Sequence, residues 1–113
     1  MKKLLSIVLL AIMFVVVGVQ PPALAADIAH GKQIFTGNCA ACHMGGRNTI
    51  MPVKNLKKES LEKYLTNFKT KGVDAIVYQV TNGKAAMPNF KRLGPTSIQD
   101  VAAYVLDQSE KGW

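Results

Sequence analysis

Two cysteines separated by two alanines, with a histidine directly after them, constrain this chain more than any other feature. Residues 39–43 read Cys39-Ala40-Ala41-Cys42-His43. This C-x-x-C-H spacing is the attachment signature of c-type haem, because the two thiols reach the vinyl groups on one edge of the ring and the next residue then lies beneath the iron. We therefore predict one haem c per chain, attached covalently at Cys39 and Cys42, with His43 as the proximal iron ligand.

Two other uses of these side chains remain open. A redox disulfide between Cys39 and Cys42 suits a thioredoxin-like protein, but the sequence shows no strand–helix–strand pattern. A structural zinc site needs four ligands, and adjacent Cys42 and His43 are poorly placed to serve together. The only other histidine is His30, which we expect at the surface of the preceding helix.

The sixth iron ligand has to come from another segment, and the methionines are the best candidates. Met44 follows His43 directly and cannot reach the opposite face of the ring, and Met51 has only a short path around it. Met87 lies 44 residues after His43 and precedes Pro88, which stiffens the chain. We predict Met87 as the ligand, with core filling as its alternative role. Ligation by His and Met raises the reduction potential and leaves no open iron position, which favours an electron carrier.

The N-terminus has the pattern of an export signal. Two lysines follow Met1, an apolar run with one serine covers residues 4–19, and residues 23–25 read Ala-Leu-Ala. We predict a signal peptide over residues 1–25 and a cytochrome c domain over residues 26–113. An uncleaved membrane anchor is the alternative, although the run is shorter than the ~20 apolar residues of a spanning helix.

The chain is basic, with 14 lysines and arginines against 7 acidic residues. Without Lys2 and Lys3 the predicted domain has 12 basic residues and a formal charge of +5. Because an exported protein rarely meets nucleic acid, an acidic protein partner is the leading interpretation. The lysines of residues 54–71 are either an ordinary solvated face or a source of long-range steering. Lys91 and Arg92, just after the Met87 loop, are the predicted docking residues.

The apolar periodicity predicts a mostly helical domain with no strand run. The predicted helices follow Asp27 up to Gly37-Asn38, run from Leu56 to Phe68, lie between Gly72 and Gly83, and follow Pro95 with a pattern that continues to Leu106. In the last one, Ser97 and Asp100 resemble a capping box, and the apolar positions from Ile98 to Leu106 recur at helical spacing.

Aromatic and small residues suggest how these helices meet. Gly31 permits close approach of another backbone, and Phe35 and Tyr104 can meet where the first and last helices cross. We also expect Tyr64 and Tyr78 in the core or at crossings. Trp113, the last residue, is predicted to cap the packing.

Several longer segments resemble a known family. They are Asn38-Cys39-Ala40-Ala41-Cys42-His43, Leu56-Lys57-Lys58, Gln79-Val80-Thr81-Asn82-Gly83-Lys84-Ala85-Ala86-Met87-Pro88, Val101-Ala102-Ala103-Tyr104-Val105-Leu106 and Gly112-Trp113. The chain resembles cytochrome c6, also called cytochrome c553, of cyanobacterial and algal photosynthesis. The resemblance covers residues 26–113 and implies an all-α class I cytochrome c fold, about four helices wrapped around one covalent haem.

The resemblance also implies a function and further site residues. Members are soluble one-electron carriers from cytochrome f of the cytochrome b6f complex to photosystem I, and some also supply a terminal cytochrome oxidase. They act in the thylakoid lumen or periplasm, as monomers in transient contact with membrane complexes. Met87 matches the axial methionine, Asn48 and Gln79 match polar residues near the haem, and Arg92 matches a residue used in docking to photosystem I.

Two other functions stay open at this point. A haem enzyme or ligand sensor, such as a peroxidase, needs an open iron position and a distal acid or base. No histidine follows His43, which disfavours it. A membrane-anchored electron-entry module would instead keep the apolar N-terminal segment.

Overall fold

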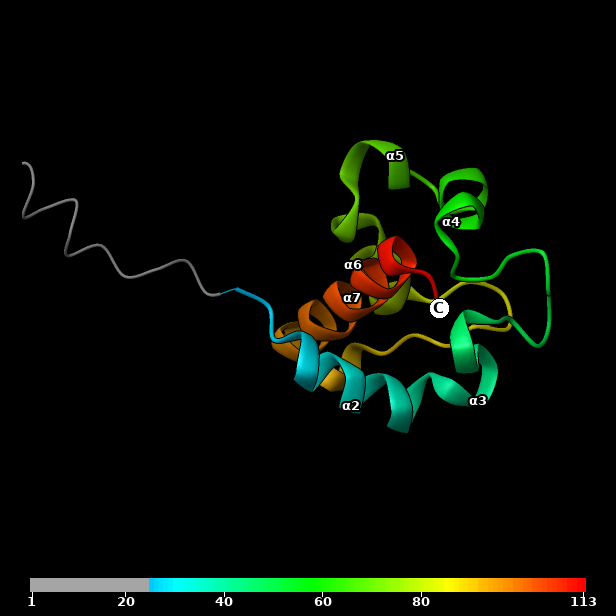
Figure 1. Ribbon diagram of the computed structural model, residues 1–113. Coiled ribbons are helices and arrows are strands. Elements are labelled where there is room, and N and C mark those ends of the chain that lie inside the picture. Colours follow the sequence, from blue (N-terminus) through cyan, green and yellow to red (C-terminus); the bar gives the residue numbers. More distant parts are fainter. Residues whose placement is uncertain (1–24) are drawn as a thin grey trace, which may run out of the picture.

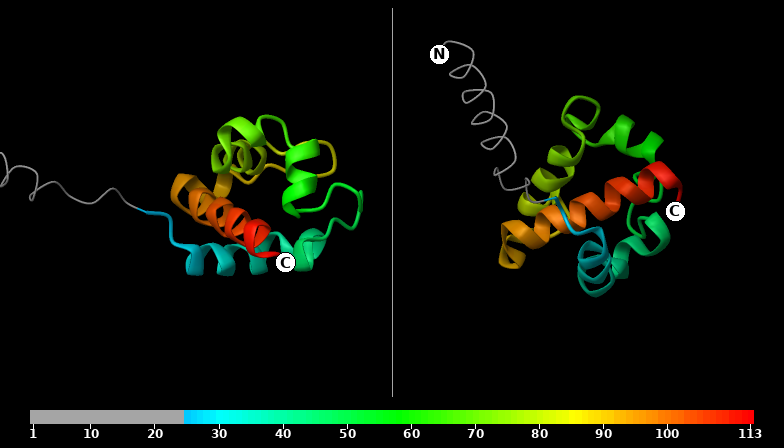
Figure 2. Two further views of the ribbon diagram at one scale, coloured as in Figure 1. Left: turned by 45° about the horizontal axis from the view of Figure 1, so that its top comes forward. Right: turned by 60° about the vertical axis from the view of Figure 1, so that its left-hand side comes forward.

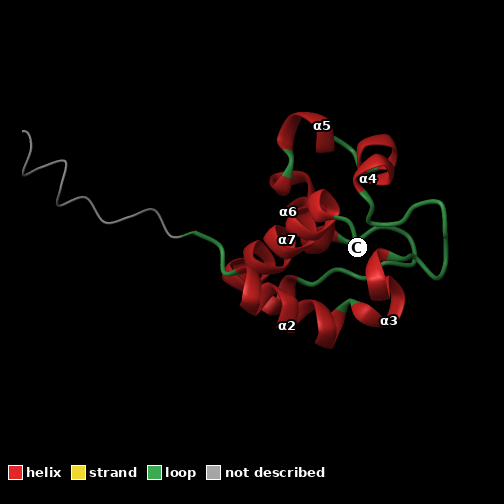
Figure 3. Cartoon of the chain, in the orientation of Figure 1, coloured by secondary structure: helices red, strands yellow, loops and turns green. Residues whose placement is uncertain are grey.

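The computed structural model describes residues 25–113, and within them the chain folds into helices joined by loops (Figures 1 and 3). The helices are α2 (Ile28–Asn38), α3 (Ala40–His43), α4 (Lys58–Tyr64), α5 (Phe68–Lys71), α6 (Val73–Asn82) and α7 (Gly94–Lys111), with 3-10 turns η1 (Met44–Gly46) and η2 (Lys91–Leu93). The only extended pairing in this range is a single bridge between Lys84 and Met87. The all-α prediction is confirmed. The predicted signal peptide lies outside the described residues, apart from Ala25.

The first predicted helix is confirmed as α2. The Asp27 side chain caps it by accepting a hydrogen bond from the backbone N–H of His30 at 3.0 Å. At its other end the N–H of Cys39 still bonds to the carbonyl of Phe35, at 2.8 Å. The helix therefore places Cys39 against the core of the domain.

The second predicted helix, Leu56 to Phe68, is wrong as one continuous element. Helix α4 ends at Tyr64, and α5 starts again at Phe68. Between them Leu65 is extended, and Asn67 has φ 64°, a left-handed conformation that asparagine tolerates better than most residues. The turn buries Phe68, so core packing wins over helix continuity.

The last helix starts earlier than predicted, and its predicted cap is wrong. Helix α7 begins at Gly94, with Pro95 in its first turn, where a missing N–H costs nothing. Ser97 and Asp100 therefore lie inside the helix. Asp100 is buried and accepts hydrogen bonds from the N–H of Asp27 at 2.8 Å and from His30 Nδ1 at 2.7 Å. These bonds tie the start of α2 to α7. The His30 side chain is 40% exposed, so His30 lies at the surface as predicted and also makes this link.

Helices α2 and α7 cross in close contact, as predicted. A Cβ on Gly31 would collide with the backbone carbonyl of Asp100, so only glycine allows this approach. Farther along, the rings of Phe35 and Tyr104 pack with centroids 5.3 Å apart. Trp113 stacks on the same Phe35 ring, also at 5.3 Å, which confirms its predicted capping role.

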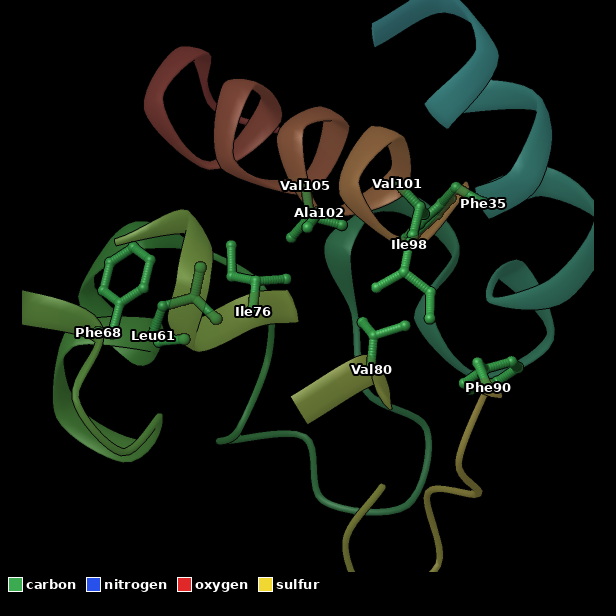
Figure 4. Packing of buried hydrophobic residues seen from close by; sticks show 11 residues of the cluster. Phe35, Leu61, Phe68, Ile76, Val80, Phe90, Ile98, Val101, Ala102 and Val105 are labelled. Atoms are coloured by element: carbon green, nitrogen blue, oxygen red, sulfur yellow. The ribbon is translucent and has the colours of Figure 1, made fainter. Parts of the chain in front are cut away.

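The core lies between α7 and the helices on either side of it (Figure 4). Its buried members are Phe35, Leu61, Phe68, Ala75, Ile76, Val80, Phe90, Ile98, Val101, Ala102 and Val105. Tyr64 and Tyr78 do not join it, because their exposed fractions are 38% and 71%; for these two the prediction is wrong. Within residues 25–113 no helix is both long and apolar enough to cross a membrane.

Candidate haem-binding site

The two cysteines lie on one short helical turn at the end of α2. Cys39 joins α2 to α3, and the N–H groups of Cys42 and His43 both bond to its carbonyl, at 3.2 and 2.9 Å. Both thiols are free; Cys39 is half-buried against the core and Cys42 is exposed. Because residues three apart share one face of a helix, the turn presents both thiols to the same region of space.

Burial raises the pKa of the Cys39 thiol to about 11, and the nearby Arg92 guanidinium opposes this shift. Cys39 is therefore protonated at neutral pH. Because the thiolate is the reactive form, this raised pKa lowers the reactivity of the Cys39 sulfur at neutral pH.

The ring of His43 is oriented by the chain that follows it. Its Nδ1 lies 2.8 Å from the carbonyl oxygen of Arg47. Since a carbonyl only accepts, Nδ1 carries the hydrogen and donates, which leaves Nε2 of the neutral ring with a free lone pair. A histidine that binds a metal through one ring nitrogen usually donates a hydrogen bond from the other, as His43 does here.

Residues 44–57, the His43 loop, are held from inside by Asn48. Its Oδ1 accepts from the N–H groups of Ile50 and Met51, at 3.1 and 2.8 Å, and its Nδ2 donates to the carbonyl of Lys54 at 2.9 Å. The structure thus gives Asn48 a role in shaping this loop. Its predicted closeness to haem stays a prediction.

The His43 loop is also tied to the C-terminus. The indole Nε1 of Trp113 donates to the carbonyl of Leu56 at 2.8 Å, and the N–H of Leu56 bonds to the carbonyl of Gly46 at 2.8 Å. The Trp113 ring occupies the space that a Cβ on Gly46 would need. Sequence reasoning gave Trp113 a packing role but missed this link, because it joins residues 57 positions apart.

Met87 lies in residues 84–93, the Met87 segment. Lys84 and Met87 exchange backbone hydrogen bonds of 2.9 and 3.0 Å. A Cβ on Gly83, which has φ 68°, would lie 2.5 Å from the Met87 carbonyl oxygen, so the turn requires glycine. Met87 itself is half-buried, whereas Met44 and Met51 are 67% and 46% exposed.

Gln79 on α6 approaches the thioether of Met87. Its Nε2 lies 3.7 Å from the Met87 sulfur, within hydrogen-bonding distance for sulfur. The structure therefore brings together two of the predicted site residues. The amide restrains the sulfur without occupying both of its lone pairs.

The two predicted docking residues share the turn η2 but differ in their surroundings. Lys91 is exposed. Arg92 lies with its guanidinium carbon 5.1 Å from the Phe90 ring centroid, and Nη2 donates to Asn38 Oδ1 at 3.3 Å. Arg92 thus links the Met87 segment to the end of α2, a link the sequence did not indicate.

The donor set fits the predicted haem. Attachment of haem c requires two free thiols, and His/Met ligation requires an imidazole nitrogen and a thioether. The structure provides the free thiols of Cys39 and Cys42, the unengaged Nε2 of His43 and the restrained sulfur of Met87. In Figure 2 (left), α3 and the chain that follows α6 lie at the same end of the molecule, α3 at the bottom and the chain after α6 at the top. By contrast, no three His, Cys, Asp or Glu side chains among residues 25–113 are grouped as a metal site would need.

Comparisons with known proteins agree with this arrangement. Residues 26–105 match the family model described as cytochrome C oxidase, cbb3-type, subunit III. Cytochrome c6 of Porphyra purpurea is 55% identical over 114 residues, with 100% of both chains covered. Cytochrome c6 of Limnospira maxima is 60% identical over 88 residues, which cover 77% of this chain and 99% of the relative.

Solved structures place the fold in the same group. Cytochrome c6 from the diatom Phaeodactylum tricornutum superimposes with a TM-score of 0.74 at 53% sequence identity. The match covers 78% of this chain and 100% of the diatom protein. The helices described above therefore form a class I cytochrome c fold.

Proposed function

Since this chain belongs to the cytochrome c6 family, we propose that it carries single electrons from cytochrome f of the cytochrome b6f complex to photosystem I. Members of this family are electron carriers rather than enzymes, and they carry haem c. The donor, the acceptor and the residue roles below are our proposal. The observation that carries it is the donor set: the Cys39/Cys42 thiols, the oriented His43 and the restrained Met87.

In this proposal each residue has one task. Cys39 and Cys42 would form thioether bonds by adding their S–H groups across the two haem vinyl groups, which would hold the cofactor permanently. His43 would bind iron through Nε2, with its ring held by the Arg47 carbonyl, and Met87 would bind it through sulfur. A bound haem would supply an iron that changes charge by one electron, and a thioether ligand would raise its reduction potential. With both residues bound, the chain would keep small molecules from the iron.

An absorption spectrum of the exported protein tests this ligand set. We expect a sharp α band when reduced and a weak iron–sulfur band in the far red when oxidised. Extraction of the denatured protein with acidified organic solvent tests the covalent bonds. Haem that leaves with the solvent would contradict the roles of Cys39 and Cys42.

Speed in such a carrier depends on how often it meets its partner. A shuttle has to bind weakly, and opposite charge can raise the encounter rate by orders of magnitude. The Met87 segment contains no acidic residue, and its Lys91 and Arg92 are exposed. We infer that they face an acidic site on photosystem I during docking.

Flash-induced oxidation by photosystem I over a salt series tests this docking. The rate is expected to fall as salt rises, because the Debye length shrinks from ~10 Å at 0.1 M to ~3 Å at 1 M. Arg92→Glu should slow transfer strongly at low salt, and Lys32→Glu, with the same charge change on α2, should slow it less. A rate that rises with salt throughout would remove the steering argument.

A terminal oxidase is the second candidate acceptor. The observation in its favour is the match of residues 26–105 to a model described as an oxidase subunit. Oxidase-containing membranes that oxidise the reduced protein as fast as photosystem I does would support two acceptors.

We also propose that residues 1–25 are an export signal and that residues 26–113 act in the thylakoid lumen or periplasm as a monomer. That range has 88 residues, the length over which the Limnospira maxima relative aligns. N-terminal sequencing of the exported protein should read Ala26-Asp27-Ile28. A retained apolar segment would instead favour the membrane-anchored alternative.

A further inference from the structure

We propose that the exposed face of α4 and α5 binds the anionic lipids of a membrane surface. We define this lysine face as Lys54, Lys57, Lys58, Lys63, Lys69 and Lys71, with Tyr64 among them. All seven side chains are exposed. This goes beyond electron transfer, because it concerns where the carrier is held between two transfers.

The positive charge of the domain is concentrated in residues 54–71. They hold 6 of the 12 basic residues of residues 26–113 but only two acidic ones, Glu59 and Glu62. Their formal charge is +4, so the remaining residues of the domain contribute only +1. Helix α4 itself carries two lysines and two glutamates, so the excess comes from the lysines just before it and from those on α5.

The lysines are also not paired within the protein. The ion pairs among residues 25–113 are His30 with Asp100 and Lys111 with Asp107. Neither Glu59 nor Glu62 holds a lysine, so the ammonium groups of the lysine face remain available to an external anion. Polybasic surfaces of this kind are attracted to anionic lipid, by about 1 kcal/mol per residue near the membrane.

Tyr64 favours lipid over an acidic protein as the partner. Lys54 Nζ and Lys63 Nζ lie 5.7 and 5.2 Å from the centroid of its half-exposed ring. Tyrosines with lysines around them are typical of the headgroup layer, where the ring is partly apolar and the ammonium groups reach phosphate. The six cations are all lysines. The lysine ammonium is a point charge that can bind a mobile lipid headgroup in many orientations, whereas arginine is better suited to binding a carboxylate in a fixed geometry.

The position of this face allows lipid binding and docking at once. In all three views of Figures 1 and 2, α4 and α5 lie on the opposite side of the molecule from α2. Arg92 is bonded to Asn38 at the end of α2, so Arg92 lies away from the lysine face. A carrier lying on a membrane through α4 and α5 keeps its docking residues free and searches for partners in two dimensions.

Co-sedimentation of the haem-loaded, exported protein with vesicles tests this proposal. We expect binding to mixed phosphatidylglycerol and phosphatidylcholine vesicles at low salt, release at high salt, and no binding to phosphatidylcholine alone. Lys57→Glu/Lys58→Glu should lower the partition coefficient at least about tenfold. The fold should survive, because acidic side chains at the start of α4 favour the helix. Lys32→Glu/Lys84→Glu has the same net charge and should change binding much less.

Three results would overturn the proposal. The first is no binding to the phosphatidylglycerol vesicles at low salt. The second is an equal loss in both double variants, which would mean that only net charge matters. The third is unchanged vesicle binding by Lys57→Glu/Lys58→Glu together with slower transfer to an acceptor in detergent, which would make α4 and α5 a surface for an acidic protein.

Discussion

The His43 loop directly follows one predicted iron ligand and the Met87 segment contains the other, but the protein holds these two regions in different ways. The His43 loop is fixed by bonds along its length: Asn48 bonds to three backbone groups of the loop, Ser60 Oγ donates to the Val53 carbonyl at 2.9 Å, and Trp113 bonds to the carbonyl of Leu56. The Met87 segment closes mainly on itself, through the paired bonds of Lys84 and Met87.

The Met87 segment reaches the rest of the domain at a few places. Phe90 is buried, and its N–H bonds to the carbonyl of Val80 at 2.9 Å. Gln79 approaches the Met87 sulfur, and Arg92 reaches Asn38 over a long 3.3 Å bond. The His43 loop is therefore held by more bonds to the rest of the domain than the Met87 segment, which would depend more on the proposed bond from Met87 to iron.

Removal of the methionine sulfur should have the largest effect on the site. In Met87→Ala the iron–sulfur band should vanish, carbon monoxide should bind, and the reduction potential should fall by a sizeable part of the ~0.8 V range that axial ligands control. The far-ultraviolet circular dichroism should stay close to that of the parent, because the His43 loop keeps its own bonds. Absorption and redox titration measure these changes.

Met51→Ala is the matched control for this prediction. Met51 is 46% exposed, and only its backbone N–H bonds to Asn48. Its loss should leave the band and the potential unchanged. If Met51→Ala loses the band while Met87→Ala keeps it, the ligand assignment reverses.

The next largest effect should come from releasing the His43 loop at the C-terminus. Trp113→Ala removes a ring packed on Phe35 and on Gly46, together with its bond to Leu56. We expect a loss of about 2–4 kcal/mol in the free energy of unfolding, below the full cost of a buried aromatic because Trp113 is only half-buried. Denaturant unfolding followed by circular dichroism measures it.

Trp113→Phe separates the two contributions of this side chain. It keeps a ring against Phe35 and loses the N–H bond to Leu56, so it should cost about 1 kcal/mol. Tyr78→Ala is the surface control, since Tyr78 is 71% exposed, and should stay within ~0.5 kcal/mol of the parent. An equal loss for Trp113→Ala and Tyr78→Ala would show that Trp113 does not hold the His43 loop to the C-terminus.

The residues of the candidate site were easier to pick out from the sequence than the contacts that hold them, and their haem roles stay predictions. The C-x-x-C-H motif rests on local spacing, Met87 was chosen for its long separation from His43, and three of the four predicted helices follow from apolar periodicity. The contacts of Trp113 with Leu56 and of Arg92 with Asn38 join distant residues, so no local pattern carries them. The break at Asn67 was missed because the burial of Phe68 is a tertiary effect.

A third prediction tests the α2–α7 crossing, since α2 leads into the cysteine turn and α7 follows the Met87 segment. Hydrogen bonds from His30 and from the Asp27 N–H hold the pKa of Asp100 below its usual value, against the opposing effect of burial. A lowered pKa means that the carboxylate stabilises the fold fully above the ordinary aspartate pKa of ~3.9, and that this stabilisation is lost as the pH falls through the folded value.

Asp100→Asn should therefore cost about 1–3 kcal/mol at pH 7, because the buried bonds to a charged acceptor are weakened. Below about pH 4 the parent should lose stability more steeply than the variant. Unfolding curves over a pH series compare the two. Parallel curves through this range would show that Asp100 does not contribute the acid sensitivity, and Asp107→Asn, in an exposed pair with Lys111, is the control.

The smallest effect should come from the amide that approaches the Met87 sulfur. Gln79 Nε2 lies 3.7 Å from this atom, and an N–H donor draws electron density from sulfur. A thioether that gives less density to iron favours the ferrous state, so Gln79→Val should lower the reduction potential. A hydrogen bond of ~0.5–1.5 kcal/mol corresponds to roughly 20–60 mV at 59 mV per tenfold change for one electron. The iron–sulfur band should remain, because Met87 still binds.

Asn48→Ala, which loosens the His43 loop without touching Met87, should change the unfolding free energy more than the potential. A variant at Gln79 that keeps the parent potential would mean that the sulfur is tuned by its burial alone, and that the methionine side is held by Phe90 and the Lys84–Met87 bridge.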